Sequence, residues 1–334
     1  MQMYKLMFLN TAIMGTLITI SSYSWFSMWM GLEINMLSII PLFSSTKNMF
    51  ASEAGTKYFM TQALASMLLL LSILMALTKN ETIYMMSVEK LILNSALLTK
   101  LGSAPFHVWF PEVIEGLSWM NSLLLLTWQK IAPMILIMNT QMENKIIMMA
   151  IISSLMVSSI MAFNQISLRK IMAFSSINHI AWMLAATMVS TTMWSYYFTI
   201  YSLISLNLIL MMNSNKVFLL NQMSNLMEKN KKVKLSFTVN FMSLGGLPPF
   251  LGFLPKWLLI NLMIEKNMIL IALTLIMLTM IMLFIYIQLT LSSIIMGQTE
   301  LKTYSPLNFN WNSQLLNSIT INSLILCISM YNLL

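Results

Sequence analysis

The sequence predicts an all-α protein that crosses a membrane many times. Of its 334 residues, 58% are hydrophobic and only 8% are charged, whereas a soluble domain carries about 25% charged residues. The apolar residues form runs of about 20, which is the length that an α-helix needs to cross a bilayer. Two of these runs are broken by glycine and proline. We therefore expect one membrane domain over residues 1–334, with about eleven spanning helices, two of them discontinuous.

The expected spans follow one another along the chain with mostly short connections. The first begins almost at Met1 and is not followed by the small-residue cleavage site of a signal peptide. The longest connections are 213–236 and 293–313, and the lysine-rich 213–236 is expected to be a solvated loop or a surface helix. In order, the expected spans are 3–21, 23–43, 57–78, 84–110 (broken), 121–139, 146–163, 170–190, 194–212, 237–260 (broken), 268–292 and 314–332.

The fourth and ninth spans are interrupted by the same pattern. In each, a glycine is followed by Pro-Phe three and four positions later and by a second proline at position nine. Proline interrupts a helix because it lacks the N–H and its ring clashes with the preceding turn. Paired breaks of this kind indicate an ion or substrate pathway in transporters that are built from repeats. The glycines lie 144 residues apart, and the residues expected to form the breaks are Gly102, Pro105, Gly246, Pro249 and Pro255.

Composition excludes several kinds of site. A single cysteine, Cys327, cannot form an intrachain disulfide or a four-thiolate iron–sulfur site. The chain contains no Asp, which weakens the case for a sodium site built on paired aspartates. The net charge of +8 comes mainly from lysines in loops, so it does not indicate nucleic-acid binding. The 37 methionines exceed what packing demands and indicate a biased genome or genetic code.

The loop charges predict the orientation of the chain. If the expected spans are correct, eleven loop Lys and Arg residues share the side of the N-terminus and three lie on the other side. Positive loops stay in the compartment from which a membrane protein is inserted. We therefore expect the N-terminus to face that compartment and the C-terminus, after an odd number of spans, to face the other.

A few ionisable side chains remain inside the expected spans. Glu33 and Lys130 lie near the middle of theirs, while Lys100 and Lys256 accompany the two breaks. Each such charge costs about 3 kcal/mol on insertion scales. Lys90, next to Glu89 near a span end, is expected to be an interface residue.

These side chains have structural and functional interpretations. Glu33 could serve as one half of a helix-locking ion pair, and Lys130 could extend toward the membrane surface. Lys100 and Lys256 could cap the carbonyls that the breaks expose. Alternatively, the set moves protons, because burial disfavours a charged lysine and an approaching glutamate restores the charge. His107 and His179 are further candidates for a proton relay.

Four segments carry a resemblance to a known family. They are 31–37, with Gly-Leu-Glu-Ile-Asn; 99–113, around the first break; 127–133, with Thr-Trp-Gln-Lys; and 245–257, around the second break. Together they resemble the family of subunit 2 of mitochondrial NADH:ubiquinone oxidoreductase, respiratory complex I. The resemblance covers essentially the whole chain.

The resemblance implies an antiporter-like fold with two inverted five-helix repeats, each with one discontinuous helix. It implies that Glu33 and Lys100 form an essential pair, that Lys130 is the central lysine, and that Lys256 leads to the outlet. Bacterial relatives have fourteen helices, and the resemblance implies that this chain lacks the first three, which agrees with the count of eleven.

Family membership also implies a location and partners. The chain would be a multi-pass protein of the mitochondrial inner membrane, with its N-terminus in the matrix and its C-terminus in the intermembrane space. It would hold no cofactor, because FMN, the iron–sulfur clusters and ubiquinone belong to other subunits of the enzyme. Its expected partners are other membrane-arm and accessory subunits, with phospholipids such as cardiolipin.

Three functions fit these observations. The first is proton translocation as a subunit of the H⁺-translocating NADH:ubiquinone reductase. The second is a stand-alone cation/proton antiporter of the same fold. The third is a membrane scaffold, in which neutralising the buried charges would change stability alone.

Overall fold

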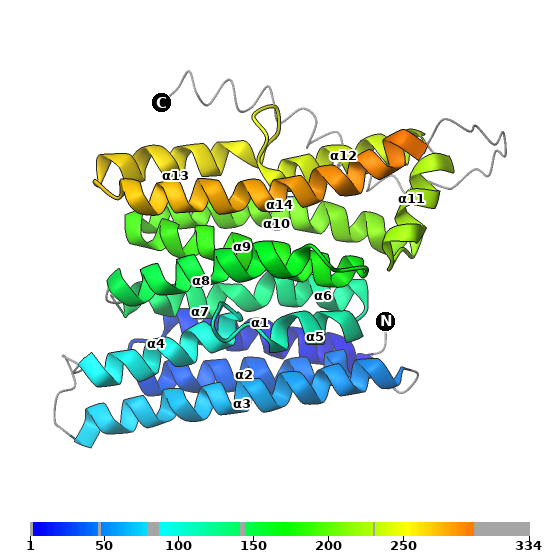
Figure 1. The fold of residues 1–334 in the computed structure, drawn as a ribbon. Helices are drawn as coiled ribbons and strands as arrows, with labels where there is room; N and C mark the ends of the chain where they lie inside the picture. Colours follow the sequence, from blue (N-terminus) through cyan, green and yellow to red (C-terminus); the bar gives the residue numbers. More distant parts are fainter. Residues whose placement is uncertain (1–2, 46–47, 79–86, 141–143, 230, 297–334) are drawn as a thin grey trace. The chain divides into compact units, whose positions relative to one another are not determined.

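The computed structural model describes residues 3–45, 48–78, 87–140, 144–229 and 231–296. The described residues form α-helices joined by short connections (Figure 1). Their large apolar side chains are exposed in great number, among them Met7, Leu64, Met149, Leu270 and Met277. Such surfaces are rare on soluble monomers, and in a membrane protein they face lipid tails.

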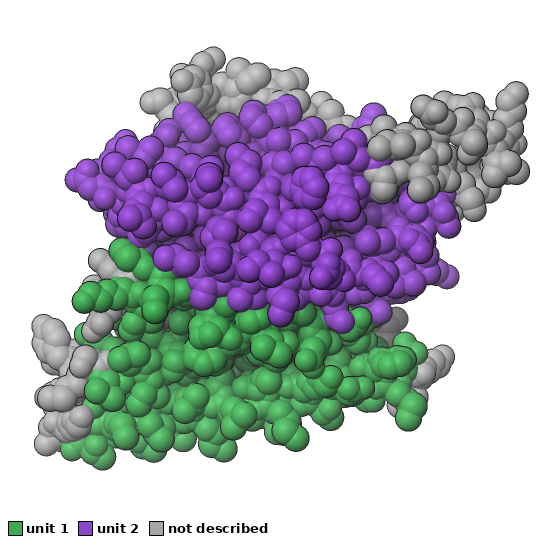
Figure 2. All heavy atoms as spheres, in the orientation of Figure 1, with its two compact units in different colours: residues 1–150 green, residues 151–334 purple. Residues whose placement is uncertain are grey.

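The chain divides into two compact units, residues 1–150 and residues 151–334 (Figure 2). Each is described separately below. The expected single domain over 1–334 stays a prediction.

In the first unit, long helices pack side by side. Helix α2 lies between α1 and α3, and α3 also packs against α4 and α5 (Figure 1). The close crossing of α1 and α2 depends on glycine, since a Cβ on Gly31 would lie 2.8 Å from the backbone nitrogen of Thr19. The helices of this unit are α1 (Met3–Ser21), α2 (Trp25–Phe43), α3 (Met49–Thr78), α4 (Ser87–Leu101), α5 (Trp109–Gly116), α6 (Trp119–Leu126) and α7 (Trp128–Asn139).

The second unit is built around a nearly completely buried helix, α9. Helices α10, α13 and α14 contact it. Around the start of α9, Leu168 N–H donates to the carbonyl of Phe218 and Leu220 N–H donates to that of Ile166, which fixes the start of the surface helix α11. The helices here are α9 (Leu168–Val189), α10 (Thr191–Asn215), α11 (Leu220–Lys229), α12 (Lys231–Gly245), α13 (Phe253–Glu265) and α14 (Ile269–Met296), preceded by α8 (Asn144–Ala162), which contains the boundary between units.

Ten of the eleven expected spans correspond to described helices. The two broken spans are α4 with α5 and α12 with α13, so the helix count exceeds the span count. Eight helical segments of the described residues are long and apolar enough to cross a membrane, and one of them joins α6 and α7. The eleventh expected span, 314–332, lies outside the described residues. The lysine-rich connection is a helix, α11, followed by the start of α12.

The order of helices repeats along the chain. Helices α8, α9, α10, α12 and α13 begin between 141 and 144 residues after α1, α2, α3, α4 and α5, respectively. The 144-residue spacing of the two breaks is therefore the spacing of a larger repeat, which includes the three helices before each break.

One irregularity was not expected. The span 121–139 is interrupted at Thr127, where α6 ends and α7 begins. Thr127 has φ −114° and ψ −68°, and its hydroxyl donates to the carbonyl of Leu123 at 2.7 Å. Threonine hydroxyls bonded in this way bend helices. The bend lies three residues before Lys130.

Candidate functional site

Both breaks have the same backbone structure. Gly102 and Gly246 adopt positive φ angles of 72° and 81°, which glycine reaches at little cost. In each, the glycine N–H donates to the carbonyl three residues back, and the next residue donates five residues back. This pair of bonds is the Schellman motif that ends helices. The expected breaks at Gly102 with Pro105 and at Gly246 with Pro249 are present, but Pro255 lies in the first turn of α13. It does not interrupt that helix, because an N–H there would have no helical partner.

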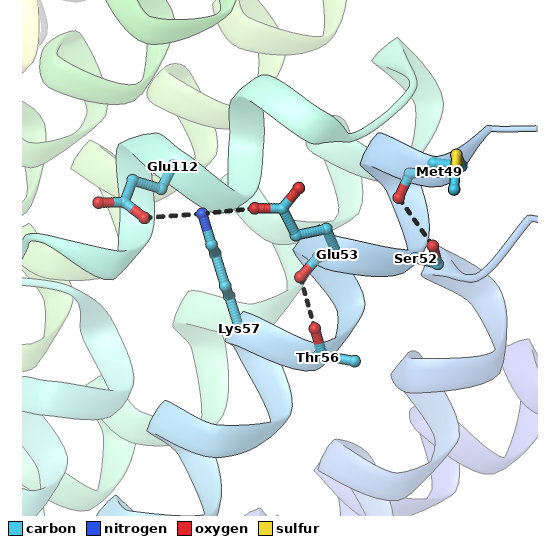
Figure 3. Close-up of polar contacts among 6 residues, drawn as sticks. All are labelled: Met49, Ser52, Glu53, Thr56, Lys57 and Glu112. Atoms are coloured by element: carbon cyan, nitrogen blue, oxygen red, sulfur yellow. Dashed lines mark hydrogen bonds and ion pairs between the residues drawn. The ribbon is translucent and has the colours of Figure 1, made fainter.

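At the first break, the indole of Trp109 hydrogen-bonds a backbone carbonyl at the end of α4. Trp109 Nε1 donates to the carbonyl of Thr99 at 3.1 Å. Helix α5 is held against α3 by Lys57, whose Nζ lies 3.0 Å from Glu53 and 3.1 Å from Glu112 (Figure 3). These three side chains are substantially exposed, so the contact positions α5 and contributes little free energy. Capping at this break is therefore done by Trp109, not by Lys100.

Lys100 lies in the last turn of α4 and is 7% exposed. The carboxylate of Glu33, in the middle of α2, interacts with it electrostatically. No ion pair within 4.0 Å joins these two described residues, and Oε1 of Glu33 is buried without a hydrogen-bond partner among them. The structure thus brings Glu33 and Lys100 near one another without a direct contact.

Lys130 is the most deeply buried of the lysines whose side chains the structure describes, at 1% exposure. Its Nζ lies 5.9 Å from the centre of the Phe110 ring, a cation–π contact. Phe110 belongs to α5, and it packs where a Cβ on Gly102 would approach it to 3.0 Å. Lys130 therefore lies beside the first break, and its burial inside the protein contradicts the alternative of a side chain that extends to the membrane surface.

Lys256 lies at the second break and caps it. Its Nζ donates to the carbonyls of Leu244 at 3.2 Å and Gly245 at 2.9 Å. It also lies 5.5 Å from the centre of the Trp182 ring. A Cβ on Gly246 would lie 2.8 Å from Cδ of Lys256, so the glycine leaves room for the lysine stem. The capping interpretation therefore describes a real contact of Lys256.

The two histidines have different surroundings. His179, on α9, is 5% exposed, and its Nδ1 lies 2.9 Å from the hydroxyl of Tyr197. Tyr197 in turn stacks on Trp182, the ring below Lys256. His107 is half-buried in the loop of the first break, and its Nδ1 has no hydrogen-bond partner among the described residues. His179 thus belongs to the surroundings of Lys256 in the second unit, and His107 belongs to the first break.

Glu89 is a buried acid. From the sequence it was expected only as the neighbour of Lys90 near the end of a span. The structure places it in the first turn of α4 at 0% exposure. It precedes Lys100 by eleven residues, which is three helical turns, so both side chains lie on one face. The buried residues Leu93, Ala96 and Leu97 lie along this face as well. The burial of Glu89 could therefore have been predicted from its spacing to Lys100 and to these apolar residues.

Polar side chains also surround Lys100 from other helices. Asn35 on α2, Tyr58 and Gln62 on α3, and Gln129 on α7 line a cavity of about 10 Å³ together with Lys100. None of these four was singled out from the sequence. Among the described residues, no three His, Cys, Asp or Glu side chains gather as they would around a metal ion.

Comparisons with known proteins agree with this geometry. The family described as NADH:quinone oxidoreductase/Mrp antiporter, transmembrane region, matches residues 22–283. Proteins named NADH-ubiquinone oxidoreductase chain 2 are similar throughout: that of Anopheles gambiae is 46% identical over 331 residues, covering 97% of both chains. That of Locusta migratoria is 38% identical over 92% of this chain and 90% of its own.

Solved structures share the fold. A chain of respiratory complex I from Thermus thermophilus superposes with a TM-score of 0.84 at 20% identity, covering 98% of this chain and 78% of that one. A chain of the Mrp complex from Dietzia sp. gives a TM-score of 0.80 at 14% identity, covering 95% and 74%. The fold is thus the all-helical, antiporter-like membrane fold. The chain belongs to the NADH:quinone oxidoreductase/Mrp antiporter family and, within it, to the NADH-ubiquinone oxidoreductase chain 2 proteins.

Proposed function

We propose that this chain moves protons across the mitochondrial inner membrane as a core membrane subunit of NADH:ubiquinone oxidoreductase. Electron transfer from NADH to ubiquinone takes place in other subunits, which hold FMN, the iron–sulfur clusters and the quinone. The relatives named chain 2 of that enzyme support this assignment at 36–46% identity. The stand-alone antiporter is the second candidate, and the match to the Mrp complex supports it through the fold alone.

The observation that carries the proposal is the burial of three lysines in helices that lie at or beside breaks. Lys100, Lys130 and Lys256 are 7%, 1% and 7% exposed. Burial of a charged lysine in a membrane is costly, and it is retained where it serves a pathway. In the proposed mechanism, Glu33 moves toward Lys100 to hold its proton and away to release it. Lys130 passes the proton on, and Lys256 delivers it to the outlet, with His107 and His179 as candidate relays.

The breaks give these groups the freedom to act. Half-helices end in carbonyls and N–H groups that bind water, and irregular backbone at membrane depth is tolerated where it lines protein or water. Trp109 and Lys256 satisfy some of these carbonyls by side-chain contacts, which a small tilt of a half-helix would lengthen. A tilt of a half-helix would therefore change the contacts of the lysine that lies beside it.

Neutralising a buried lysine tests the proposal. Lys100→Met and Lys130→Met are each expected to lower proton pumping and coupled NADH oxidation by at least about tenfold, since each removes a proton-carrying group. Pumping is measured by the quenching of a pH-sensitive dye in vesicles that contain the intact complex. The matched control is Lys145→Met, which neutralises an exposed lysine of α8 and should leave pumping unchanged.

The alternatives predict other results. Undiminished pumping in an assembled Lys130→Met complex would contradict the proposed role. A scaffold predicts a loss of assembly without a change in pumping per assembled complex. An antiporter predicts cation/proton exchange by the purified chain alone, which we expect to be absent.

The proposed orientation places the N-terminus in the matrix and the C-terminus in the intermembrane space. We expect a cysteine introduced as Lys5→Cys to react with a membrane-impermeant maleimide only in inside-out vesicles. Lys145→Cys, on the other side, should react only in right-side-out vesicles. The reverse pattern would overturn the orientation. The proposed partners are the neighbouring membrane-arm and accessory subunits, with cardiolipin as a candidate lipid.

A further inference from the structure

The small cavity beside Lys100 is lined mostly by polar side chains. Its walls include Asn35, Tyr58, Gln62, Lys100 and Gln129, from four different helices. A volume of about 10 Å³ is near the minimum that holds one water molecule. Apolar cavities stay dry, whereas a buried water needs two to four polar partners. The walls supply that number.

Three of the lining side chains hold one another in place. Asn35 Nδ2 donates to Oε1 of Gln129 at 3.1 Å, and Gln129 Nε2 donates back to Oδ1 of Asn35 at 3.0 Å. The hydroxyl of Tyr58 donates to the same Oε1 at 3.3 Å. Tyr58 is itself fixed by ring contacts with Phe43 and Trp109. This amide pair therefore joins α2 to α7 in one geometry.

The remaining donors and acceptors suit a water. Gln62 is 5% exposed, and its Nε2 makes no hydrogen bond to any described residue. A buried amide donor left in this state is destabilising, so it needs a partner in the cavity. Gln129 offers an acceptor, because Pro133 has no N–H to donate to the Gln129 carbonyl. Oδ1 of Asn35 retains a second lone pair beyond its bond to Gln129.

We propose that this cavity is a one-water site that stabilises the protonated form of Lys100, and that Asn35, Gln62 and Gln129 are its positioning residues. The water accepts from Lys100 Nζ and from Gln62 Nε2, and it donates to the acceptors of Asn35 and Gln129. It contributes about one hydrogen bond to the protonated form whether Glu33 is near or, as in this structure, stands apart, so the movement of Glu33 still decides when Lys100 releases its proton. This inference rests on the proposed function, since it assigns the water to a lysine of that pathway.

A high-resolution electron-microscopy map of the intact complex tests the site directly. We expect one ordered water within hydrogen-bonding distance of both Lys100 and Gln62. A dry cavity, in a map that resolves other buried waters, would overturn the inference. Gln62→Leu keeps the side-chain volume and removes the donor, so the water should be absent from the map of that variant.

Pumping provides the functional test. Gln62→Leu should lower pumping and coupled NADH oxidation by about fivefold, which corresponds to about 1 kcal/mol for one hydrogen bond. The matched control is Asn121→Leu, which removes another amide hydrogen bond between helices, to the carbonyl of Leu42, outside the cavity. That control should leave pumping per assembled complex unchanged.

A double-mutant cycle separates the inference from the proposed function. If the water acts through Lys100, Gln62→Leu should cause no further loss in the Lys100→Met background. An equal fivefold loss in both backgrounds, or no loss in either, overturns the one-water site. Unchanged pumping in Lys100→Met alone instead overturns the proposed role of Lys100.

Discussion

Gly252→Ala is expected to prevent the second break from forming. Gly252 lies at the start of α13 with φ −67° and ψ −14°, so alanine suits its backbone angles. The obstacle is space, because a Cβ there would lie 1.8 Å from the carbonyl oxygen of Ser243 and 2.8 Å from its carbonyl carbon. Both atoms are backbone, and relief requires the last turn of α12 to separate from α13.

That separation has further costs. Ser243 accepts the N–H of Gly246 in the turn that ends α12, and Lys256 bonds the carbonyls of the two residues that follow Ser243. Moving α12 from α13 would disturb all of these bonds. We therefore expect a loss of more than about 4 kcal/mol in the free energy of unfolding, at the extreme of single substitutions.

The measurement is the amount of assembled complex on native gels, together with its thermal inactivation. The matched control is Gly55→Ala, in the interior of α3, where the nearest atom to a Cβ is 4.0 Å away. Alanine should stabilise that helix by about 1 kcal/mol. Assembly of Gly252→Ala at the control level would show that the backbone contact is not essential.

Replacement of Lys256 is expected to have the second large effect, on pumping more than on stability. Lys256→Met removes a buried charge that costs about 3 kcal/mol to insert. It also leaves two carbonyls uncapped, each worth about 1–3 kcal/mol. Because these opposing terms nearly cancel, the complex should assemble, while coupled turnover falls by about 100-fold from the loss of a proton carrier.

Lys256→Arg distinguishes transport from capping. Arginine keeps the positive charge and can donate to the carbonyls of Leu244 and Gly245, but it does not release its proton in proteins. If Lys256 carries protons, the Lys256→Arg complex should assemble but remain defective in proton pumping. Recovery of pumping in Lys256→Arg would mean that Lys256 serves as a cap alone. Proton pumping is compared per assembled complex in both variants.

Much of the fold could be predicted from the sequence because its causes are local. A run of apolar residues becomes a spanning helix wherever it occurs, since a backbone in lipid must satisfy its own hydrogen bonds. The breaks are also local, because Gly102 and Gly246 reach positive φ and prolines follow directly. The start of α13 shows the limit, since Pro255 belongs to the helix that it was expected to interrupt.

The site was only partly predictable. A charged residue within a long apolar run can be recognised from the sequence alone, and this identified Glu33, Lys100, Lys130 and Lys256. Their partners were not, since a polar residue at the edge of a run looks the same whether it faces lipid, solvent or another helix.

By itself, the sequence determined the spans, the paired breaks, the 144-residue spacing and the lysines that accompany the breaks. The tertiary structure decided that Trp109 caps the first break and Lys256 the second, that Glu89 is buried, and that Asn35 meets Gln129. The physical reason is the range of the interactions. The length of an apolar run and the backbone angles at a break are set by residues that are close in the sequence. Asn35 and Gln129, in contrast, are 94 positions apart and come into contact only after the helices pack.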